Sequence, residues 1–342
     1  MNIALLTGTF SRFSGIDRVV AQQAESLSAE GHTVTVVCLE GDMKSEHYKV
    51  FVLGMPKSLF WQRVYRLGFF ALDRAKIRSA MKSLGKQDTV YSHQYPLNAL
   101  AHEMQREWGT RYVYYNHGIP PANTFSTWTE KIYITIFRWL TNRSLRDPDE
   151  IISISRFLAE VCKEETGRVS RVVHDTVDKE RFREAVSGDE IRAHLELGDA
   201  PVLLTVGRLS PHKGFHMLLS AFSKVREQIP DAHLLIVGKA TFEKYLAQLK
   251  RAAGPHTHFI GFVSDEDLPK FYAACDLYVT ATQWEGFNLP FAEAQEFAKP
   301  VIAFSVGPHA EVFRGKGKLV PPGDVDAMAD AIVRWLKEER HE

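Results

Sequence analysis

Residues Asp276–Phe297 read DLYVTATQWEGFNLPFAEAQEF and contain a strand, a turn and a helix in succession. The apolar run Asp276–Ala281 is typical of a buried strand, and the run that ends near Ala298 has the composition of a helix. Gly286 permits an unusual backbone turn, and Pro290 suits the first helical position, where a missing N–H is not needed. The stretch therefore predicts a strand that leads through a turn into a helix N-terminus.

Two glutamates belong to this stretch, Glu285 in the turn and Glu293 in the helix. A helix N-terminus offers free backbone N–H groups and the positive end of a dipole, which together suit a phosphate. The sequence thus predicts a phosphate cradle with a carboxylate on either side. From these residues alone, the pair can also be read as acid–base machinery.

The same alternation of strands and helices runs through the whole chain. In the second half, strands are predicted at Pro201–Val206, His233–Val237, His258–Phe262, Asp276–Thr280, Pro300–Ala303 and Gly317–Val320, with helices at Phe215–Gln228, Glu243–Ala253, Asp265–Ala274 and Asp324–Lys337. The first half gives strands at Asn2–Thr7, Thr33–Leu39, Lys49–Leu53, Thr89–Ser92, Arg111–Asn116 and Ile151–Ser155, with a helix at Ile16–Ala29. Strands separated by helices form parallel sheets.

We therefore expect two doubly wound α/β domains, residues 1–170 and 171–342, because 342 residues exceed one average domain. The link between them is placed near Ser170–Asp178. Ligands of open parallel sheets bind beyond the carboxyl ends of the strands, so we expect the two domains to face each other across a ligand-binding crevice.

The composition excludes several classes of protein. Lys and Arg balance Asp and Glu at 42 each, which argues against nucleic acid as the main partner. Three separated cysteines in apolar runs indicate buried free thiols in a reducing cytosol rather than a metal site. The N-terminus lacks the basic flank of a signal peptide, and no apolar run is long enough to span a membrane.

A basic loop follows the first strand of the second half, with Arg208 and Lys213 five residues apart in GRLSPHKG. Two cations at this position suit a diphosphate leaving group, although a solvated basic loop is the simpler interpretation of the loop alone. The glycine-bearing loop Gly8–Gly15 lacks the G-x-G-x-x-G spacing of a dinucleotide fold, and the chain contains no P-loop motif. Gly15 either contacts a phosphate or merely permits a turn.

These runs, together with LLIVGKA, HFIGFVSDEDLPKFYAACDLYVTAT, KPVIAFSVGPHAEV and GKLVPPGDVDAMADAI, closely resemble the family-4 retaining glycosyltransferases, which have the two-Rossmann GT-B fold. The resemblance covers nearly all of residues 201–336 and is looser in the first half, at GIDRVVAQQAESLSAEGHTVTVV, YYNHG and IISISRFLAE. It implies a hexosyltransferase, with mannose as one candidate sugar, in which an N-terminal acceptor domain precedes a C-terminal donor domain. No metal or other cofactor is implied.

The resemblance also implies a role for individual residues. Glu293 matches the glutamate that binds the donor ribose, Glu285 the one that binds sugar hydroxyls, and Arg208 with Lys213 the pair that neutralises the departing diphosphate. His117 matches a histidine near the reacting centre. The backbone of Gly286, Phe287, Asn288 and Leu289 matches the segment that faces the donor, and Gly15 with Ile16 matches a loop near the donor phosphate and the acceptor.

The donor expected from the resemblance is GDP-mannose or a UDP-sugar, and the acceptor is a hydroxyl of a glycan or a lipid-linked glycan in polysaccharide biosynthesis. A sugar-nucleotide epimerase and a non-catalytic nucleotide-sugar-binding subunit are the alternatives. The chain departs from the family at Ser14, Ile16 and Asp17 and at Val173–Asp178, which bears on the acceptor and the hinge.

Residues 57–86 carry eight basic side chains and one acid, interleaved with aromatic residues. A helix of this composition can lie on an anionic membrane, which would make the protein cytoplasmic with peripheral contact to the inner membrane face. It can equally pack its aromatic side chains on the sheet. The aromatic segment Phe125–Leu145 is open to two similar readings, as a lining of the acceptor site or as core.

Overall fold

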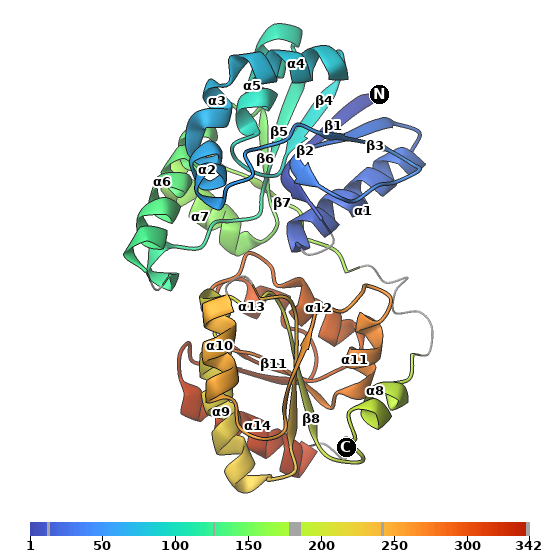
Figure 1. Cartoon of the computed structure of the whole chain (residues 1–342), viewed down its shortest axis with the longest axis vertical. Coiled ribbons are helices and arrows are strands. Elements are labelled where there is room, and N and C mark those ends of the chain that lie inside the picture. The colour runs from blue at the N-terminus through green and yellow to red at the C-terminus, as the bar shows by residue number, and fades with distance from the viewer. Residues whose placement is uncertain (12–13, 126, 178–185, 241–242, 340–342) are drawn as a thin grey trace. The chain divides into compact units, whose positions relative to one another are not determined.

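The computed structural model describes residues 1–11, 14–125, 127–177, 186–240 and 243–339, which form two compact units. The first unit comprises Met1–Asn123 and Thr127–Asp175, and the second comprises Thr124–Ser126 and Thr176–Glu342. Each unit is an α/β layer structure with one sheet (Figure 1).

The first unit has a seven-stranded parallel sheet with the order β3-β2-β1-β4-β5-β6-β7. Its strands are β1 (Asn2–Phe10), β2 (Thr33–Gly41), β3 (Lys49–Val52), β4 (Thr89–Ser92), β5 (Arg111–Asn116), β6 (Glu150–Ser153) and β7 (Arg171–Val172). Its helices are α1 (Gly15–Ala29), α2 (Leu59–Val64), α3 (Phe70–Leu72), α4 (Arg74–Leu84), α5 (Asn98–Trp108), α6 (Trp128–Ser144) and α7 (Arg156–Thr166), with a π-helical stretch at Tyr65–Phe69.

The second unit has a six-stranded parallel sheet with the order β10-β9-β8-β11-β12-β13. Its strands are β8 (Val202–Val206), β9 (His233–Val237), β10 (Thr257–Gly261), β11 (Leu277–Thr280), β12 (Val301–Phe304) and β13 (Gly317–Val320). Its helices are α8 (Asp189–His194), α9 (Phe215–Gln228), α10 (Glu243–Ala252), α11 (Leu268–Ala274), α12 (Leu289–Glu296), α13 (His309–Val312) and α14 (Val325–Arg334), with a π-helical end at Trp335–Glu339.

Alternating side chains of each buried strand build a core on both faces of the sheet. On β1, Ile3 and Leu5 pack with Val20 of α1, whereas Ala4 and Leu6 pack on the opposite face with helices α4 and α5. In the second unit, α9 and α14 lie together against strands β8, β9 and β11. Parallel strands buried on both faces need continuous apolar sequence, which is what these runs contain.

The expected fold class is confirmed, and most differences lie at the ends of elements. Strand β1 extends three residues beyond the predicted Thr7, because Thr9 and Phe10 pair with Glu40 and Gly41 of β2. The predicted loop Gly8–Gly15 is therefore shorter, and its residues 12–13 lie outside the described part of the chain, as does Asp178 at the end of the predicted link. The three cysteines are buried free thiols, as predicted.

Candidate functional site in the second unit and a histidine pair in the first

The predicted donor residues of the second unit lie at the point where its strand order reverses. Strands β8 and β11 are hydrogen-bonded neighbours in the sheet although β9 and β10 come between them in sequence. The loop after β8 carries Arg208 and Lys213, and the loop after β11 carries Glu285. Doubly wound sheets bind ligands at such a switch point, so the fold brings these residues to the expected place.

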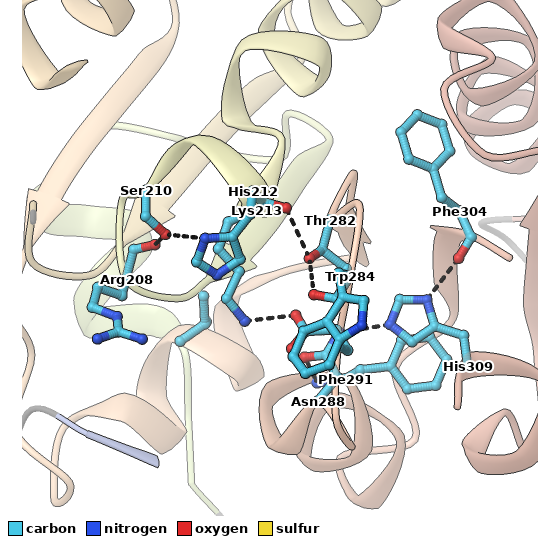
Figure 2. Close-up of polar contacts among 12 residues, drawn as sticks. Arg208, Ser210, His212, Lys213, Thr282, Trp284, Asn288, Phe291, Phe304 and His309 are labelled. Carbon is cyan, nitrogen blue, oxygen red and sulfur yellow. Dashed lines mark hydrogen bonds and ion pairs between the residues drawn. The ribbon is translucent and has the colours of Figure 1, made fainter. Parts of the chain in front are cut away.

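Hydrogen bonds to backbone carbonyls join the two loops directly. The carbonyl of His212 accepts from the Gln283 amide at 2.8 Å and from the Thr282 hydroxyl at 3.4 Å. The side-chain amide of Gln283 donates to the carbonyl of Pro211 at 3.2 Å. These contacts hold the basic turn against the end of β11, and Glu285 lies in the loop that follows this strand (Figure 2).

A largely buried ion pair links the loops at their tips. The Lys213 ammonium donates to Oε1 of Glu285 at 2.6 Å, and the two side chains are 22% and 9% exposed. Burial alone would raise the pKa of Glu285, but the charge and hydrogen bond of Lys213 outweigh it and lower that pKa. Glu285 is therefore ionised at neutral pH and only accepts hydrogen bonds, which excludes it as a general acid.

The basic side chains of the loop after β8 differ in their charge at neutral pH. Arg208 is exposed, and its side chain is drawn beside the loop in Figure 2. Burial, with the charges of Lys213 and Arg208, lowers the pKa of His212 to about 4. The positive charge of this loop at neutral pH therefore comes from Arg208 and Lys213.

Helix α12 begins with a buried cap that also fixes a neighbouring helix. Asn288 has a φ of 75°, and its Oδ1 accepts from the Phe291 amide at 3.4 Å. Its Nδ2 lies 2.8 Å from Nε2 of His309, whose Nδ1 donates to the Phe304 carbonyl at 2.6 Å (Figure 2). The prediction that Pro290 occupies the first helical position was wrong by one residue, because the helix begins at Leu289.

Glu293 lies inside α12 and is 2% exposed. The hydroxyl of Tyr272 on α11 donates to its Oε2 at 2.8 Å. Phe287, in the turn before this helix, and Leu289, its first residue, are 7% and 9% exposed. The segment from Glu285 to Glu293 thus consists mostly of buried side chains around a helix start, whose free backbone N–H groups suit an anionic ligand.

The predicted first-unit residues Gly15 and Ile16 open helix α1. Gly15 is exposed, and a Cβ added to it would meet no atom within 4 Å. Ser14 caps the helix, and the buried carboxylate of Asp17 accepts from Thr9 Oγ1 and from the Ser11 amide at 2.9 Å. Asp17 thus fixes the end of β1 to the helix start.

His117 follows strand β5 and pairs with a histidine that the sequence analysis did not single out. Nδ1 of His93, just beyond β4, lies 3.0 Å from Nε2 of His117, and the two rings stack. Burial lowers the pKa of His117 to about 4, and burial with the charge of its partner lowers that of His93 well below its usual range. Both imidazoles are neutral at pH 7.

This pair predicts a loss of stability in acid. The unfolded chain takes up protons near pH 6.5 that folded His117 binds only at about pH 4, so the free energy of unfolding falls as the pH drops between these values. For His117 alone the loss is of the order of 3 kcal/mol. Urea unfolding at a series of pH values measures it.

Variants of the two histidines test whether this pair, rather than other titrating groups, causes the loss of stability. His93→Asn/His117→Asn should flatten the dependence of unfolding free energy on pH between 6.5 and about 4. His47→Asn, at an exposed position of the same unit, serves as the control. An equal slope in the double variant and the wild type would show that these imidazoles do not resist protonation.

No role was predicted for His93, Tyr272 or His309 from the sequence. A polar residue immediately after a strand was the available signal for His93, which follows β4 as His117 follows β5. Tyr272 and His309 are separated from their partners by 21 residues each, and sequence spacing gives no sign of those contacts. In the described ranges, no cluster of three or more His, Cys, Asp or Glu side chains could hold a metal ion.

Two family models match this chain. Glycosyltransferase Family 4 matches residues 13–181, and Glycosyl transferases group 1 matches residues 187–342. The chain belongs to the family-4 retaining glycosyltransferases, which transfer a sugar from a nucleotide sugar.

Individual relatives agree with this membership. A GDP-mannose-dependent alpha-(1-6)-phosphatidylinositol monomannoside mannosyltransferase of Mycobacterium tuberculosis is 31% identical over 172 residues, 47% of this chain and 45% of that protein. This chain thus matches about half the length of that relative. An Escherichia coli UDP-Gal:alpha-D-GlcNAc-diphosphoundecaprenol alpha-1,3-galactosyltransferase is 25% identical over 94% of this chain and 84% of its own.

Solved structures confirm the fold. Anabaena Alr3699/HepE, in complex with UDP-glucose, superposes with a TM-score of 0.81 at 20% identity, over 99% of this chain and 90% of its own. The two parallel sheets are those of a GT-B glycosyltransferase.

Proposed function

We propose that this chain transfers a hexose from a nucleotide-diphosphate sugar to a hydroxyl of a lipid-linked glycan, with the donor bound by residues 171–342 and the acceptor by residues 1–170. The observation that carries the proposal is the ion pair between Lys213 and Glu285, at 2.6 Å, on the two loops of the switch point. A helix N-terminus, that of α12, follows the second of these loops.

Cleavage of a sugar–phosphate bond leaves negative charge on the departing diphosphate and positive charge on the anomeric carbon. Arg208, Lys213 and the N-terminus of α12 are proposed to stabilise the diphosphate. Glu285, ionised and acceptor-only, is proposed to bind sugar hydroxyls and to hold Lys213 in place. Lys213 and Glu285 are thus proposed to bind the donor rather than to transfer protons.

The remaining assignments follow the resemblance to the family. Glu293, oriented by Tyr272, is proposed to bind the ribose hydroxyls. The backbone from Gly286 to Leu289 is proposed to face the donor phosphate and sugar. In the first unit, His117 is proposed to contact the transferred sugar, and Gly15 with Ile16 the donor phosphate or the acceptor.

The relatives support two donor classes. The Mycobacterium tuberculosis relative is named for GDP-mannose, and the Escherichia coli relative for UDP-galactose and an undecaprenol-linked acceptor. We propose mannose as the first sugar to test and a UDP-hexose as the second. Both relatives carry a lipid in the name of their acceptor, which supports a lipid-linked acceptor here.

A donor screen tests the proposal. The purified chain is incubated with GDP-mannose, UDP-glucose, UDP-galactose or a dTDP-sugar, and release of the nucleoside diphosphate is measured. We expect one donor to be hydrolysed, and Glu293→Gln to weaken its binding by about tenfold or more, because a ribose-binding carboxylate and its charge-assisted hydrogen bonds are lost.

Glu296→Gln, an exposed position of the same helix, is the matched control. Conversion of a UDP-sugar into its epimer without hydrolysis would instead establish the epimerase. Binding of a donor with neither hydrolysis nor transfer would indicate a non-catalytic subunit. Absence of binding to every donor would contradict all three.

A further inference from the structure

Helix α6 carries an apolar stripe that points away from the core. Trp128, Ile132, Ile136 and Trp139 are 72%, 50%, 41% and 60% exposed. Their spacings of four, four and three residues place them on one face of the helix. Such a face of a globular protein normally packs on the core. The reading of the segment Phe125–Leu145 as core was therefore wrong for Trp128 and Trp139, which are exposed on this face.

The opposite face of α6 does pack on the first unit. Phe137 contacts Tyr95 edge to face, with ring centroids 5.5 Å apart, and stacks on Tyr133 at 6.0 Å. The Tyr95 hydroxyl donates to the Leu67 carbonyl at 2.9 Å. The helix is therefore fixed in place by its inner face, and its outer stripe is not needed to hold it.

Helix α2 lies beside α6, with Arg63 against Tyr133, and adds a second exposed group (Figure 1). Phe60 and Trp61 are 66% and 55% exposed and contact each other edge to face. The Arg63 guanidinium lies over the Tyr133 ring of α6, at 5.9 Å from its centroid. We call the side chains Phe60, Trp61, Trp128, Ile132, Ile136 and Trp139 the α2–α6 surface.

Positive charge surrounds the α2–α6 surface. Arg63 lies on α2, and α6 carries Lys131 and Arg143 against Glu130, whereas Arg138 of α6 pairs with Glu165. The Arg143 guanidinium lies 5.9 Å from the ring centroid of Trp139. Tryptophan with aliphatic side chains, bordered by Lys and Arg, is the composition of protein surfaces that lie in the headgroup region of anionic bilayers.

The helices α3 and α4 contribute less than the sequence suggested. Phe70 and Ile77 are buried in the core, and Lys76 donates to the Gly54 carbonyl at 2.9 Å. Arg74 pairs with Glu103 at 3.1 Å. The reading of residues 57–86 as packed on the sheet thus holds for α4, whereas Phe60 and Trp61 of α2 are exposed.

We propose that the α2–α6 surface binds the headgroup region of an anionic bilayer and holds the protein where a lipid-linked acceptor lies. The proposal rests on the proposed function for the acceptor, but the binding itself depends only on the exposed side chains and their charges. Among the described residues, no helix is long and apolar enough to cross a membrane. Contact through this surface would therefore be interfacial.

Flotation with vesicles tests this proposal. We expect the wild-type chain to float with vesicles of phosphatidylcholine and phosphatidylglycerol, to bind phosphatidylcholine alone more weakly, and to be released by salt. Trp128→Gln/Ile132→Gln/Trp139→Gln should lower the partition coefficient by about tenfold or more. Arg63→Glu/Lys131→Glu/Arg143→Glu should lower it by about 100-fold or more, since each cation contributes about fivefold.

The controls change equivalent side chains elsewhere. Val169→Gln/Phe262→Gln replaces two apolar residues that are 74% and 47% exposed, and Lys244→Glu/Lys250→Glu/Arg251→Glu reverses three exposed cations of α10. Both controls should bind vesicles as the wild type does. Donor hydrolysis without vesicles should be the same in all variants, which separates membrane binding from the proposed catalytic function.

Three outcomes would overturn the proposal. The first is the absence of wild-type binding to anionic vesicles, and the second is equal binding by wild type and both α2–α6 variants. The third is a wild-type dimer in light scattering that the triple-glutamine variant dissociates, without vesicle binding, which would assign the surface to a second copy of the chain. Absence of donor hydrolysis by the wild-type chain would contradict the proposed function but would not affect the conclusion drawn from vesicle binding.

Discussion

Replacement of Lys213 by alanine is expected to lower kcat for sugar transfer by about 10²–10³-fold, the effect of removing one preorganised group from a developing negative charge. The Lys213 side chain is 22% exposed and its ammonium pairs with the buried carboxylate of Glu285 at 2.6 Å. Its loss should also raise the pKa of Glu285, since burial then acts without the opposing charge. Initial rates of transfer measure the first effect, and thermal unfolding at a series of pH values measures the second.

Lys224→Ala is the matched control for this variant. Lys224 belongs to helix α9 of the same unit and pairs with Asp326, but these two side chains are 48% and 73% exposed. An exposed ion pair contributes little to stability, so both transfer and unfolding should change little. Transfer at the wild-type rate by folded Lys213→Ala protein would show that Lys213 does not stabilise the leaving group.

Gly214→Ala is expected to separate the two loops of the switch point. Gly214 has a φ of 68°, and a Cβ at this position would lie 1.9 Å from the Ala281 carbonyl oxygen. Since that oxygen belongs to the backbone at the end of β11, it cannot rotate away as a side chain would. The unfolding free energy should fall by about 3 kcal/mol or more. Transfer should fall by about 100-fold, because Lys213 is displaced from Glu285.

Gly254→Ala tests whether the effect comes from the close approach. A Cβ at Gly254 would meet no atom within 4 Å. Its unfolding transition and transfer rate should match those of the wild type. Transfer is measured well below the transition temperature, with circular dichroism to establish that the chain is folded. A stable and fully active Gly214→Ala protein would contradict the view that this contact positions Lys213.

The strands of both sheets were largely predictable, because parallel strands buried on both faces must be continuously apolar and short. The ranges Thr89–Ser92, Arg111–Asn116, His233–Val237 and Gly317–Val320 match the structure. The end of β1 was not predictable, because Gly8 and Thr9 interrupt the apolar run of the strand and Phe10 is a single apolar residue after them. They extend the strand only because β2 lies beside them.

The residues of the candidate donor site were predicted from their motifs, but their contacts could not be predicted. The sequence gives no indication that Glu285 pairs with Lys213, 72 positions away, or that His309 fixes the Asn288 cap. The sequence also did not predict which way the apolar face of helix α6 points. The spacing of Trp128, Ile132, Ile136 and Trp139 indicates one face but not whether that face meets the core or solvent.

The pairing of β8 with β11 has a consequence for how the second unit is assembled during synthesis. Strands β8 and β11 are neighbours in the sheet, but β9, β10 and the intervening helices lie between them in sequence. Pairing of β8 with β11 therefore brings together two distant parts of the chain. Contacts of such high sequence separation form slowly, and the segment between them must already be compact. Lys213 and Glu285 meet only when this pair has formed. We therefore expect the ability to bind a nucleotide sugar to arise late in folding, after the β8–β9–β10 half has emerged from the ribosome and collapsed.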